Sequence, residues 1–173
     1  TYLLVAQTTS EQRSGGGLVG SMGTLQTDHG QIQVGEFHHN EDFINGSNGN
    51  ASEHAVFKGP LGFSFDIRDT FAVPDIARNA EMMNEAWQRS QYACDVDGIV
   101  SVDPVFIQKM VEINGNVTLE NGTVLTSENT AEYMLNTIYK EVPVSLQDTY
   151  FEYIASTIMN KAFSNMDIAK MMK

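Results

Sequence analysis

A glycine-rich segment beside an arginine is the first place in this sequence where the residue types could do chemistry. Residues 11–17 read Glu-Gln-Arg-Ser-Gly-Gly-Gly and follow an apolar run at residues 2–6. Glycines let backbone amides approach oxygen atoms closely, and a guanidinium group can bind two of those oxygens at once. Arg13, Gly16 and Gly17 therefore form a possible phosphate site. The alternative is a flexible turn in which the arginine pairs with a carboxylate.

The glycine-rich segment matches neither of the two common phosphate-binding motifs. A P-loop ends in Gly-Lys-Ser/Thr, and a dinucleotide fingerprint opens a helix, and both features are missing after the glycines. The glycines alone do not indicate a nucleotide.

A second arginine offers a similar chemistry further along the chain. Arg68 stands next to Asp69, so a cation that binds phosphate could act beside a carboxylate that holds Mg²⁺. An ordinary ion-paired loop is the alternative. The acidic residues Asp95, Asp97 and Asp103 are better suited to helix capping and solubility than to catalysis, and no Ser-His-Asp or Cys-His order stands out.

The histidines and the cysteine do not indicate a metal centre. His38, His39 and Asp42 are near one another in sequence, but no further ligand has a helpful spacing, so a solvated loop is the expected structure. Cys94 is the only cysteine, which excludes a disulfide within the chain and a zinc site with several cysteines. We therefore expect no structural metal.

Length and charge limit the classes of function. The 173 residues suit a single domain with one core. The chain has 10 Lys+Arg against 22 Asp+Glu, a formal net charge of -12, which argues against nucleic acid or an anionic membrane as a general partner. An anionic ligand would need a local basic pocket. The oligomeric state is not indicated by the sequence.

The beginning of the chain suggests an excised domain. Thr1 starts directly in a strand-like run without an initiator Met, and the sequence has neither a signal peptide nor an apolar stretch of the ~20 residues that a membrane span requires. We expect that a targeting or anchoring segment precedes this domain.

The elements that must position these groups are clearest at residues 97–119. An apolar strand at 99–102 is followed by Asp103-Pro104, a good helix start, and Asn114-Gly115 ends the helix before a second strand at 117–119. A strand, a covering helix and a return to strand form the building unit of an α/β fold. The prediction is one α/β domain, with helices packed on the faces of a mixed central sheet.

Other segments supply further elements of this fold. Residues 2–6 predict a buried strand, and Asp28-His-Gly30 predicts a hairpin between strands at 18–27 and 31–37. A helix is expected at 74–89 with an apolar stripe in its core-facing side. That stripe consists of Ile76, Ala80, Met83 and Trp87.

The C-terminal third predicts a hairpin and two helices. Glu120-Asn-Gly-Thr123 is typical of a type I′ turn, Thr126-Ser-Glu-Asn129 caps a helix, and Ser145-Leu-Gln-Asp148 opens a final helix. In contrast, residues 38–56 are rich in small polar residues and predict a flexible exposed loop, whose part at 45–52 would be dispensable.

The pattern of residues along nearly the whole chain resembles an uncharacterised family, common in actinobacterial envelope proteins and catalogued as domain of unknown function four-zero-one-two. The family implies an extracytoplasmic, cell-envelope protein but no activity. The residues that carry the resemblance are Gln7, Glu11, Arg13, Gly16-Gly17, Gly20-Ser21, Asp75, Trp87, Val96-Asp97-Gly98-Ile99, Asp103-Pro104, Gly115-Asn116-Val117, Gly122, Leu125-Thr126 and Glu128-Asn129.

More distantly, the order of parts is similar to the LytR-CpsA-Psr phosphotransferases, which move glycopolymers from a polyprenyl-pyrophosphate carrier onto the cell wall. Arg13-Ser14 followed by glycines resembles the Arg-Ser-Asp-Thr motif of that family without its aspartate. Ile67-Arg-Asp-Thr70 resembles its Pro-Arg-Asp-Thr motif, and residues 87–117 resemble the helix and strand that come later in it. Its third, arginine-rich motif would fall at 136–148, where this chain has Asn136, Thr137, Tyr139 and Lys140 instead.

The resemblance implies a LytR-CpsA-Psr-like fold outside the membrane, attachment to the membrane only through an omitted anchor, and a lipid-linked or cell-wall glycan phosphate as the partner. Arg13 and Arg68 would together bind the phosphate, and Asp69 would hold Mg²⁺ if the domain were active. The missing aspartate and arginines argue against full activity. Three hypotheses stay open: a degenerate binding module, an active metal-assisted phosphotransferase, and a purely structural domain that binds other proteins.

Overall fold

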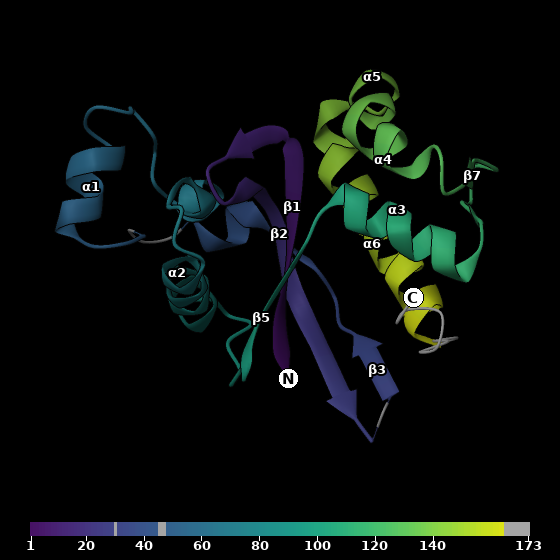
Figure 1. The fold of residues 1–173 in the computed structure, drawn as a ribbon, viewed down its shortest axis with the longest axis horizontal. Helices are drawn as coiled ribbons and strands as arrows, with labels where there is room; N and C mark the ends of the chain where they lie inside the picture. Colours follow the sequence, from purple (N-terminus) through teal and green to yellow (C-terminus); the bar gives the residue numbers. More distant parts are fainter. Residues whose placement is uncertain (30, 45–47, 165–173) are drawn as a thin grey trace.

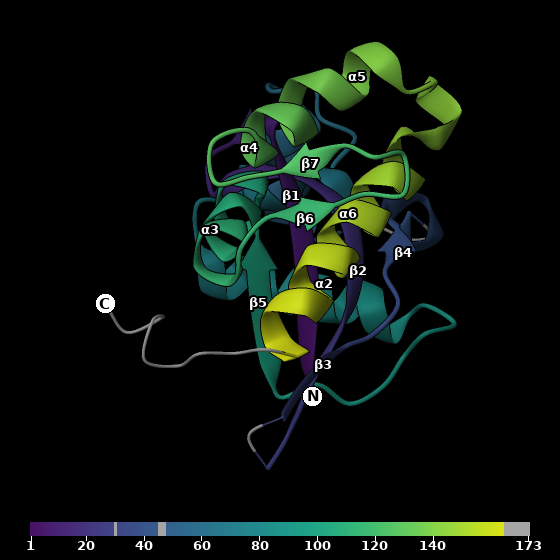
Figure 2. The ribbon, with the colours of Figure 1, turned by 90° about the vertical axis from the view of Figure 1, so that its right-hand side faces the viewer.

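A mixed sheet with β1 at its centre organises the structure, a computed structural model that describes residues 1–29, 31–44 and 48–164. β1 pairs with β2 in antiparallel orientation and with β5 in parallel orientation (Figure 1). β3 and β4 both pair with β2 in antiparallel orientation, and β4 is labelled in Figure 2. The predicted α/β class with a mixed sheet is confirmed. The strands are β1 (Tyr2–Arg13), β2 (Gly16–Asp28), β3 (Gln31–Val34), β4 (His38–His39) and β5 (Gly98–Val102).

Both faces of β1 are buried, which explains its continuous apolar run. Leu3, Leu4 and Val5 have no exposed surface, and successive side chains of a strand point to opposite faces. Leu4 packs in the larger core, whereas Leu3 and Val5 pack in a second core on the other face. The sheet is therefore the middle layer between two sets of helices.

Different helices cover the two faces of the sheet, as Figures 1 and 2 show from two directions. α3 (Pro104–Asn114) and α6 (Val144–Ser164) lie on the face of the larger core. The short helix η2 (Ile67–Ala72) and α2 (Ile76–Gln88) lie on the opposite face. Within the described part of the chain, no helix is long and apolar enough to cross a bilayer.

The unit at residues 97–119 forms its first strand, its helix and its second strand where the sequence predicts them. Asp103 caps α3 by accepting the backbone N–H of Phe106, and Gly115 ends the helix with a positive φ of 85°. β6 (Val117–Thr118) then pairs with β7 (Val124–Leu125) in a separate two-stranded sheet. The second strand therefore belongs to the hairpin and not to the central sheet, and this hairpin adds apolar side chains to the core around α3 and α6.

The apolar stripe of α2 differs from the predicted one at its beginning. Asp75 caps the helix, so Ile76 falls in the first turn and its exposed fraction is 65%. Met83 and Trp87 are buried as predicted. The buried side chains of this helix also include Asn79, Met82 and Ala86.

The expected loop at 38–56 contains regular structure in its described part. Besides β4 it holds a short helix, η1 (Asn40–Phe43), and most of α1 (Ala51–Phe57). The interpretation of 45–52 as a surface excursion is wrong at Asn48, whose exposed fraction is 2% and whose amide donates to Thr70. Residues 45–47 lie outside the described residues.

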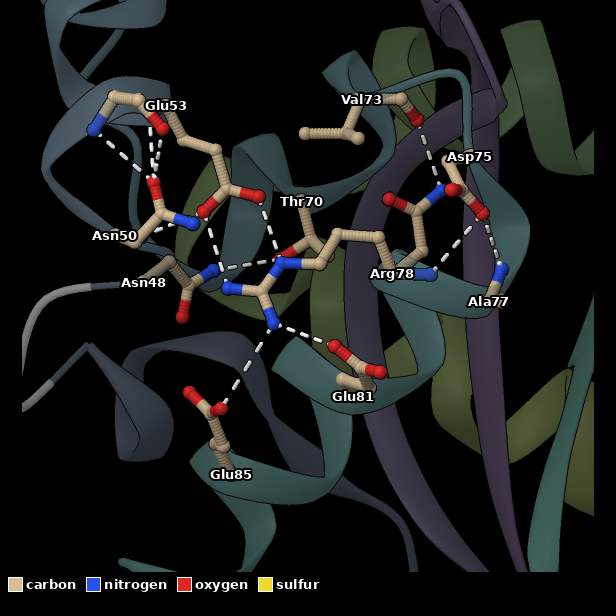
Figure 3. A network of polar contacts seen from close by, with 12 residues as sticks. Asn48, Asn50, Glu53, Thr70, Val73, Asp75, Ala77, Arg78, Glu81 and Glu85 are labelled. Atoms are coloured by element: carbon tan, nitrogen blue, oxygen red, sulfur yellow. Dashed lines mark hydrogen bonds and ion pairs between the residues drawn. The ribbon is translucent and has the colours of Figure 1, made fainter.

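Figure 3 shows how α1 is held against α2 by polar contacts. Asn50 and Glu53 form a capping box at the start of α1. Glu53 also accepts hydrogen bonds from Arg78 of α2 at 2.7 and 3.1 Å, and Arg78 reaches Glu81 at 2.7 Å. These bonds hold the pKa of Glu53 below its ordinary value, against the opposing effect of burial. This polar clamp acts together with an apolar contact, because Phe57 of α1 stacks on the buried Phe65 with ring centroids 4.9 Å apart.

A π-helical turn interrupts the first of the two helices at the C-terminal end of the chain. The chain runs through α4 (Thr130–Glu132), the π-helical η3 (Tyr133–Thr137) and α5 (Ile138–Glu141) before α6 begins at Val144. The predicted hairpin and both helices are present. The hairpin turn is not type I′, because Gly122 has a positive φ in it whereas Asn121 does not.

Candidate functional site

A cavity of about 300 Å³ lies where the parallel pairing of β1 and β5 ends. Ala6 and Val102 are the last paired residues of these strands, and both line the cavity. Ligands of α/β proteins commonly bind at the carboxyl ends of parallel strands. The other lining residues are Gln7, Thr8, Glu11, Leu18, Gly20, Ser21, His39, Asn40, Glu41, Arg68, Asp103, Pro104, Met134, Tyr139, Gln147, Phe151 and Ala155.

Gln7 shapes the floor of this cavity through hydrogen bonds at both ends of its amide. Its Nε2 donates to Ser101 of β5 at 2.6 Å, and its Oε1 accepts the backbone N–H of Gly17 at 2.6 Å. The register between β1 and β2 shifts immediately after Ala6. Gln7 itself remains paired, opposite Val19 of β2, after this shift.

Gly16 and Gly17 make room for Gln7 and for the backbone of β1. A Cβ atom on Gly16, whose φ is +146°, would overlap the amide oxygen of Gln7, and one on Gly17 would overlap the carbonyl of Thr8. The N–H of Gly17 is also engaged by Gln7. Neither glycine is among the described residues that line the cavity. The structure thus gives both glycines a packing role at the positions where an anion contact was expected.

Arg13 forms a partly buried ion pair with Asp69. Its Nε and Nη2 donate to Asp69 Oδ1 at 3.2 and 3.1 Å, and its guanidinium lies 5.6 Å from the ring centroid of Phe63. The side chains of Arg13 and Asp69 are 15% and 8% exposed. Arg13 is not among the described lining residues of the cavity.

Arg68 does line the cavity, and it is paired with Asp66. Its Nε donates to Asp66 Oδ1 at 2.9 Å, and its Nη2 donates to Oδ2 of the same carboxylate. Burial would raise the pKa of Asp66, but the hydrogen bonds from Arg68 outweigh it and hold that pKa below its ordinary value. The same pairing raises the pKa of Arg68. Its side chain keeps 37% exposure, so one edge of the guanidinium can meet a ligand.

The two arginines thus pair with two carboxylates at the same short helix, η2, but they do not share a pocket. Asp66 caps η2 and Asp69 lies in its first turn. Of the described lysines and arginines, Arg68 alone reaches the cavity wall.

Asp69 does not have the surroundings of a magnesium ligand. Its Oδ1 accepts from Arg13 and its Oδ2 accepts the backbone N–H of Phe65 at 3.2 Å. A guanidinium group already neutralises the carboxylate, and hard cations require several free oxygen ligands. Among residues 1–29, 31–44 and 48–164, no group of three His, Cys, Asp or Glu side chains could hold a metal ion. The residues present therefore do not fit the expected Mg²⁺ site.

The other candidate residues from the sequence lie in different parts of the structure and have different contacts. His38 stacks on Tyr92 with ring centroids 3.5 Å apart, while His39 lines the cavity. Asp97 binds the N-terminal amine at 2.8 Å, and Asp95 is exposed. Asp103 caps α3 and also lines the cavity.

Sequence reasoning missed the helical wall of the cavity. Tyr139 of α5 contacts the second half of β1, because its hydroxyl lies 3.4 Å from Thr8 Oγ1 and 3.3 Å from Ser10 Oγ. Gln147 donates to the carbonyl of Val142 at 2.9 Å, and Phe151 packs beside Tyr139 with ring centroids 5.4 Å apart. The one sequence signal was helical periodicity, which marks Phe151 as inward-facing but does not show that it faces a cavity.

Carboxylates outnumber cations in the lining. Glu11, Glu41 and Asp103 line the cavity together with Arg68, whose charge is already matched by Asp66. The remainder of the wall mixes hydroxyl and amide groups with apolar surface. Such a lining suits a ligand that offers both hydrogen-bond donors and an apolar face.

The family of the chain is established by comparison with known proteins. The chain belongs to the family described as protein of unknown function (DUF4012), whose model matches residues 1–139. This range includes every strand and the cavity lining as far as Tyr139, whereas Gln147, Phe151 and Ala155 come after it. Neither the curated proteins nor the solved structures contain a significant match to the chain.

Proposed function

We propose that this member of the DUF4012 family is a binding module of the cell envelope that recognises a phosphorylated glycan, either linked to a lipid carrier or part of the wall. The observation that carries the proposal is the cavity of about 300 Å³ at the point where the parallel pairing of β1 and β5 ends, with Arg68 in its wall. The location outside the membrane rests on the resemblance to envelope proteins and to the LytR-CpsA-Psr transferases.

The lining supports recognition of a glycan. Thr8, Ser21 and Tyr139 present hydroxyl groups, and Leu18 and Phe151 present apolar surface. Ligand sites usually combine mostly apolar walls with a few convergent polar groups. Arg68 adds a cation, which can bind a phosphate oxygen through the edge that Asp66 leaves free.

The surroundings of Asp69 and Arg13 favour binding without catalysis. In the alternative, an active metal-assisted phosphotransferase, Asp69 would hold Mg²⁺ while both arginines stabilised the transferred phosphate. Arg13 instead neutralises Asp69 in a partly buried pair. A purely structural domain is the alternative if no ligand binds. The observation that favours it is that both arginines are ion-paired.

Amide chemical-shift mapping with a soluble probe tests this proposal. The labelled domain would be titrated with N-acetylglucosamine 1-phosphate, which contains a sugar and a phosphate in one molecule. We expect the largest shifts at cavity residues such as Gln7, Gly20 and Tyr139. Shifts confined to other surfaces, or none at millimolar probe, would contradict the proposal.

A pair of charge variants then tests the role of Arg68. Arg68→Gln combined with Asp66→Asn removes both charges of the ion pair and keeps a capping side chain at the start of η2. This double variant should bind the probe less tightly than the native domain, by a factor of about three or less, because Asp66 already shares the guanidinium. Arg89→Gln removes a comparable charge from a residue that pairs weakly with Glu85 at 4.0 Å and does not line the cavity. It should leave the affinity unchanged.

A further inference from the structure

We infer that the group inside the cavity is an uncharged, hydroxyl-rich sugar unit, and that the phosphate of the ligand contributes little to affinity. This inference rests on the proposed function and specifies which part of the ligand is recognised. It follows from the charge, the chemistry and the size of the cavity, which are considered in turn.

The charges of the cavity disfavour an anion within it. Glu11, Glu41 and Asp103 all line it, and a phosphate placed among them would meet like charges. The opposing cation, Arg68, is bound through two of its nitrogens by Asp66. A dianionic group would therefore gain one shared guanidinium and face three carboxylates, of which Glu11 lies 3.9 Å from the guanidinium of Arg13.

The same carboxylates favour hydroxyl groups. An ionised carboxylate only accepts hydrogen bonds, and a sugar hydroxyl can donate one without bringing a charge. The hydroxyls of Thr8 and Ser21 can both donate and accept, so they can satisfy the oxygen atoms of the ligand. A polyhydroxyl ligand is the class that meets this set of groups without an unpaired charge.

The apolar part of the lining fits the face of a sugar ring. Tyr139 and Phe151 lie side by side with their rings inclined by 57°, and both border the cavity. A pyranose ring carries C–H groups on its faces and hydroxyls around its edge. An aromatic wall can cover the former while the carboxylates and hydroxyls bind the latter.

The size of the cavity limits what can enter. Its volume of about 300 Å³ is at the lower end of the range of about 300–1,000 Å³ for small-molecule sites. Such a space holds a ring-sized group but not the whole of a long polyprenyl chain. The lipid of a lipid-linked ligand would therefore remain outside this cavity.

Calorimetric titration with matched probes separates this inference from the proposed function. The probes are the methyl glycosides of glucose, galactose, mannose and N-acetylglucosamine, the corresponding sugar 1-phosphates, and inorganic pyrophosphate. For the sugar that binds, the methyl glycoside and the 1-phosphate should have dissociation constants within about threefold of one another, a difference below 1 kcal/mol. Pyrophosphate should not bind.

The other possible results of this titration distinguish an error in the inference from an error in the proposed function. A 1-phosphate that binds at least about tenfold more tightly than its glycoside, and is displaced by pyrophosphate, would overturn the inference and leave the proposed function standing. A glycoside that binds while its 1-phosphate does not would uphold the inference and contradict a phosphorylated ligand. Failure of every probe to bind would contradict both.

Charge variants test the cause directly. Glu11→Gln and Glu41→Gln each remove one lining charge with nearly unchanged shape. Each should weaken the hydrogen bonds to the sugar hydroxyls in both probes, so the informative quantity is the ratio of the two affinities, which should shift severalfold in favour of the sugar 1-phosphate over the methyl glycoside. Glu128→Gln changes the net charge equally at an exposed residue outside the lining, so it should alter neither affinity. An unchanged ratio of the two affinities in both lining variants would show that these carboxylates do not exclude the anion.

Discussion

Gln7 illustrates how a single buried amide determines the residues that follow it in sequence. Its side chain spans from Ser101 of β5 to the backbone of Gly17 in β2, at the point where the register between β1 and β2 shifts. A glycine at position 16 is needed because the amide of Gln7 lies where a Cβ atom would be. The glycines at this point therefore have a steric cause, although their composition suggests a phosphate loop.

Replacing Gly16 by alanine tests this steric role. The new Cβ would overlap the Gln7 amide, and φ would stay at +146°, so Gly16→Ala should lower the free energy of unfolding by about 1–3 kcal/mol. Gly20→Ala is the matched control, since its Cβ would meet nothing closer than the Ala6 carbonyl at 3.6 Å. Urea unfolding followed by the fluorescence of Trp87, the single and buried tryptophan, measures both. Equal stabilities of the two variants would exclude the steric explanation.

Arg13 is expected to support folding more than binding. Arg13→Ala would leave Asp69, 8% exposed, without its cation, at a cost of roughly 1–3 kcal/mol in the free energy of unfolding. Arg89→Ala, whose side chain is 38% exposed, should change this free energy by less than about 0.5 kcal/mol. Chemical denaturation of the three proteins gives the comparison. A fully stable Arg13→Ala domain with weakened ligand binding would return Arg13 to the ligand site.

The ion pair between Glu53 and Arg78 predicts a pH dependence of stability. The pKa of Glu53 is lower in the folded state than its ordinary value of 4.5, so its stabilising contribution is present above that value and is lost as pH falls through the folded pKa. Glu53→Gln keeps a side chain suited to the capping box but removes the charge. The native domain should be more stable than this variant near neutral pH, and the difference should shrink below about pH 4. A difference that is constant down to pH 2 would contradict a contribution from this charge.

At the scale of elements, α6 shows how a segment outside the family match completes the core. The match ends at residue 139, yet Ile154, Ile158 and Met159 of α6 are at most 1% exposed and pack in the larger core. Without this helix, the face of the sheet that carries Leu4 would lack its main cover. The fold of this chain therefore depends on residues that follow the matched region.

A core truncation in α6 should reveal this dependence. Ile158→Ala removes fully buried methyl groups and should cost about 2–5 kcal/mol in the free energy of unfolding. Val144→Ala, at a residue 80% exposed in the same helix, should cost less than about 0.5 kcal/mol. Thermal and urea unfolding measure both. Similar small effects at the two positions would mean that α6 is not part of the cooperative core.

Capping residues and apolar runs in the sequence predicted the positions of individual helices and strands. Asp103-Pro104 and Asn114-Gly115 bound α3 as expected, and the apolar run at the start of the chain forms the central strand. The strand at 117–119 is present, but a two-residue strand with alternating burial carries no signal for the sheet it joins. Composition predicts a loop at 38–56 because it does not reveal the few specific contacts that order this segment, such as the buried Phe43 and the hydrogen bond of Asn48 to Thr70.

At the scale of the whole molecule, the cavity joins parts of the chain that are far apart in sequence. Thr8 in β1 meets Tyr139 of α5, and Ala155 of α6 borders the same space. The sequence predicted one phosphate site shared by Arg13 and Arg68, whereas Arg68 lines the cavity and Arg13 does not. The location of Arg13 depends on its pairing with Asp69, 56 residues away, which no local pattern encodes.

The central claim is that this cavity is the ligand site, and Gly20→Leu tests it most directly. Gly20 lines the cavity, and a Cβ there has space, so a leucine side chain should fill the cavity without unfolding the domain. The measurement is calorimetric titration of the native domain, Gly20→Ala and Gly20→Leu with the sugar probes. We predict binding to the native domain, weaker binding to Gly20→Ala, and loss of binding to a folded Gly20→Leu. Undiminished binding to the folded leucine variant would contradict the account.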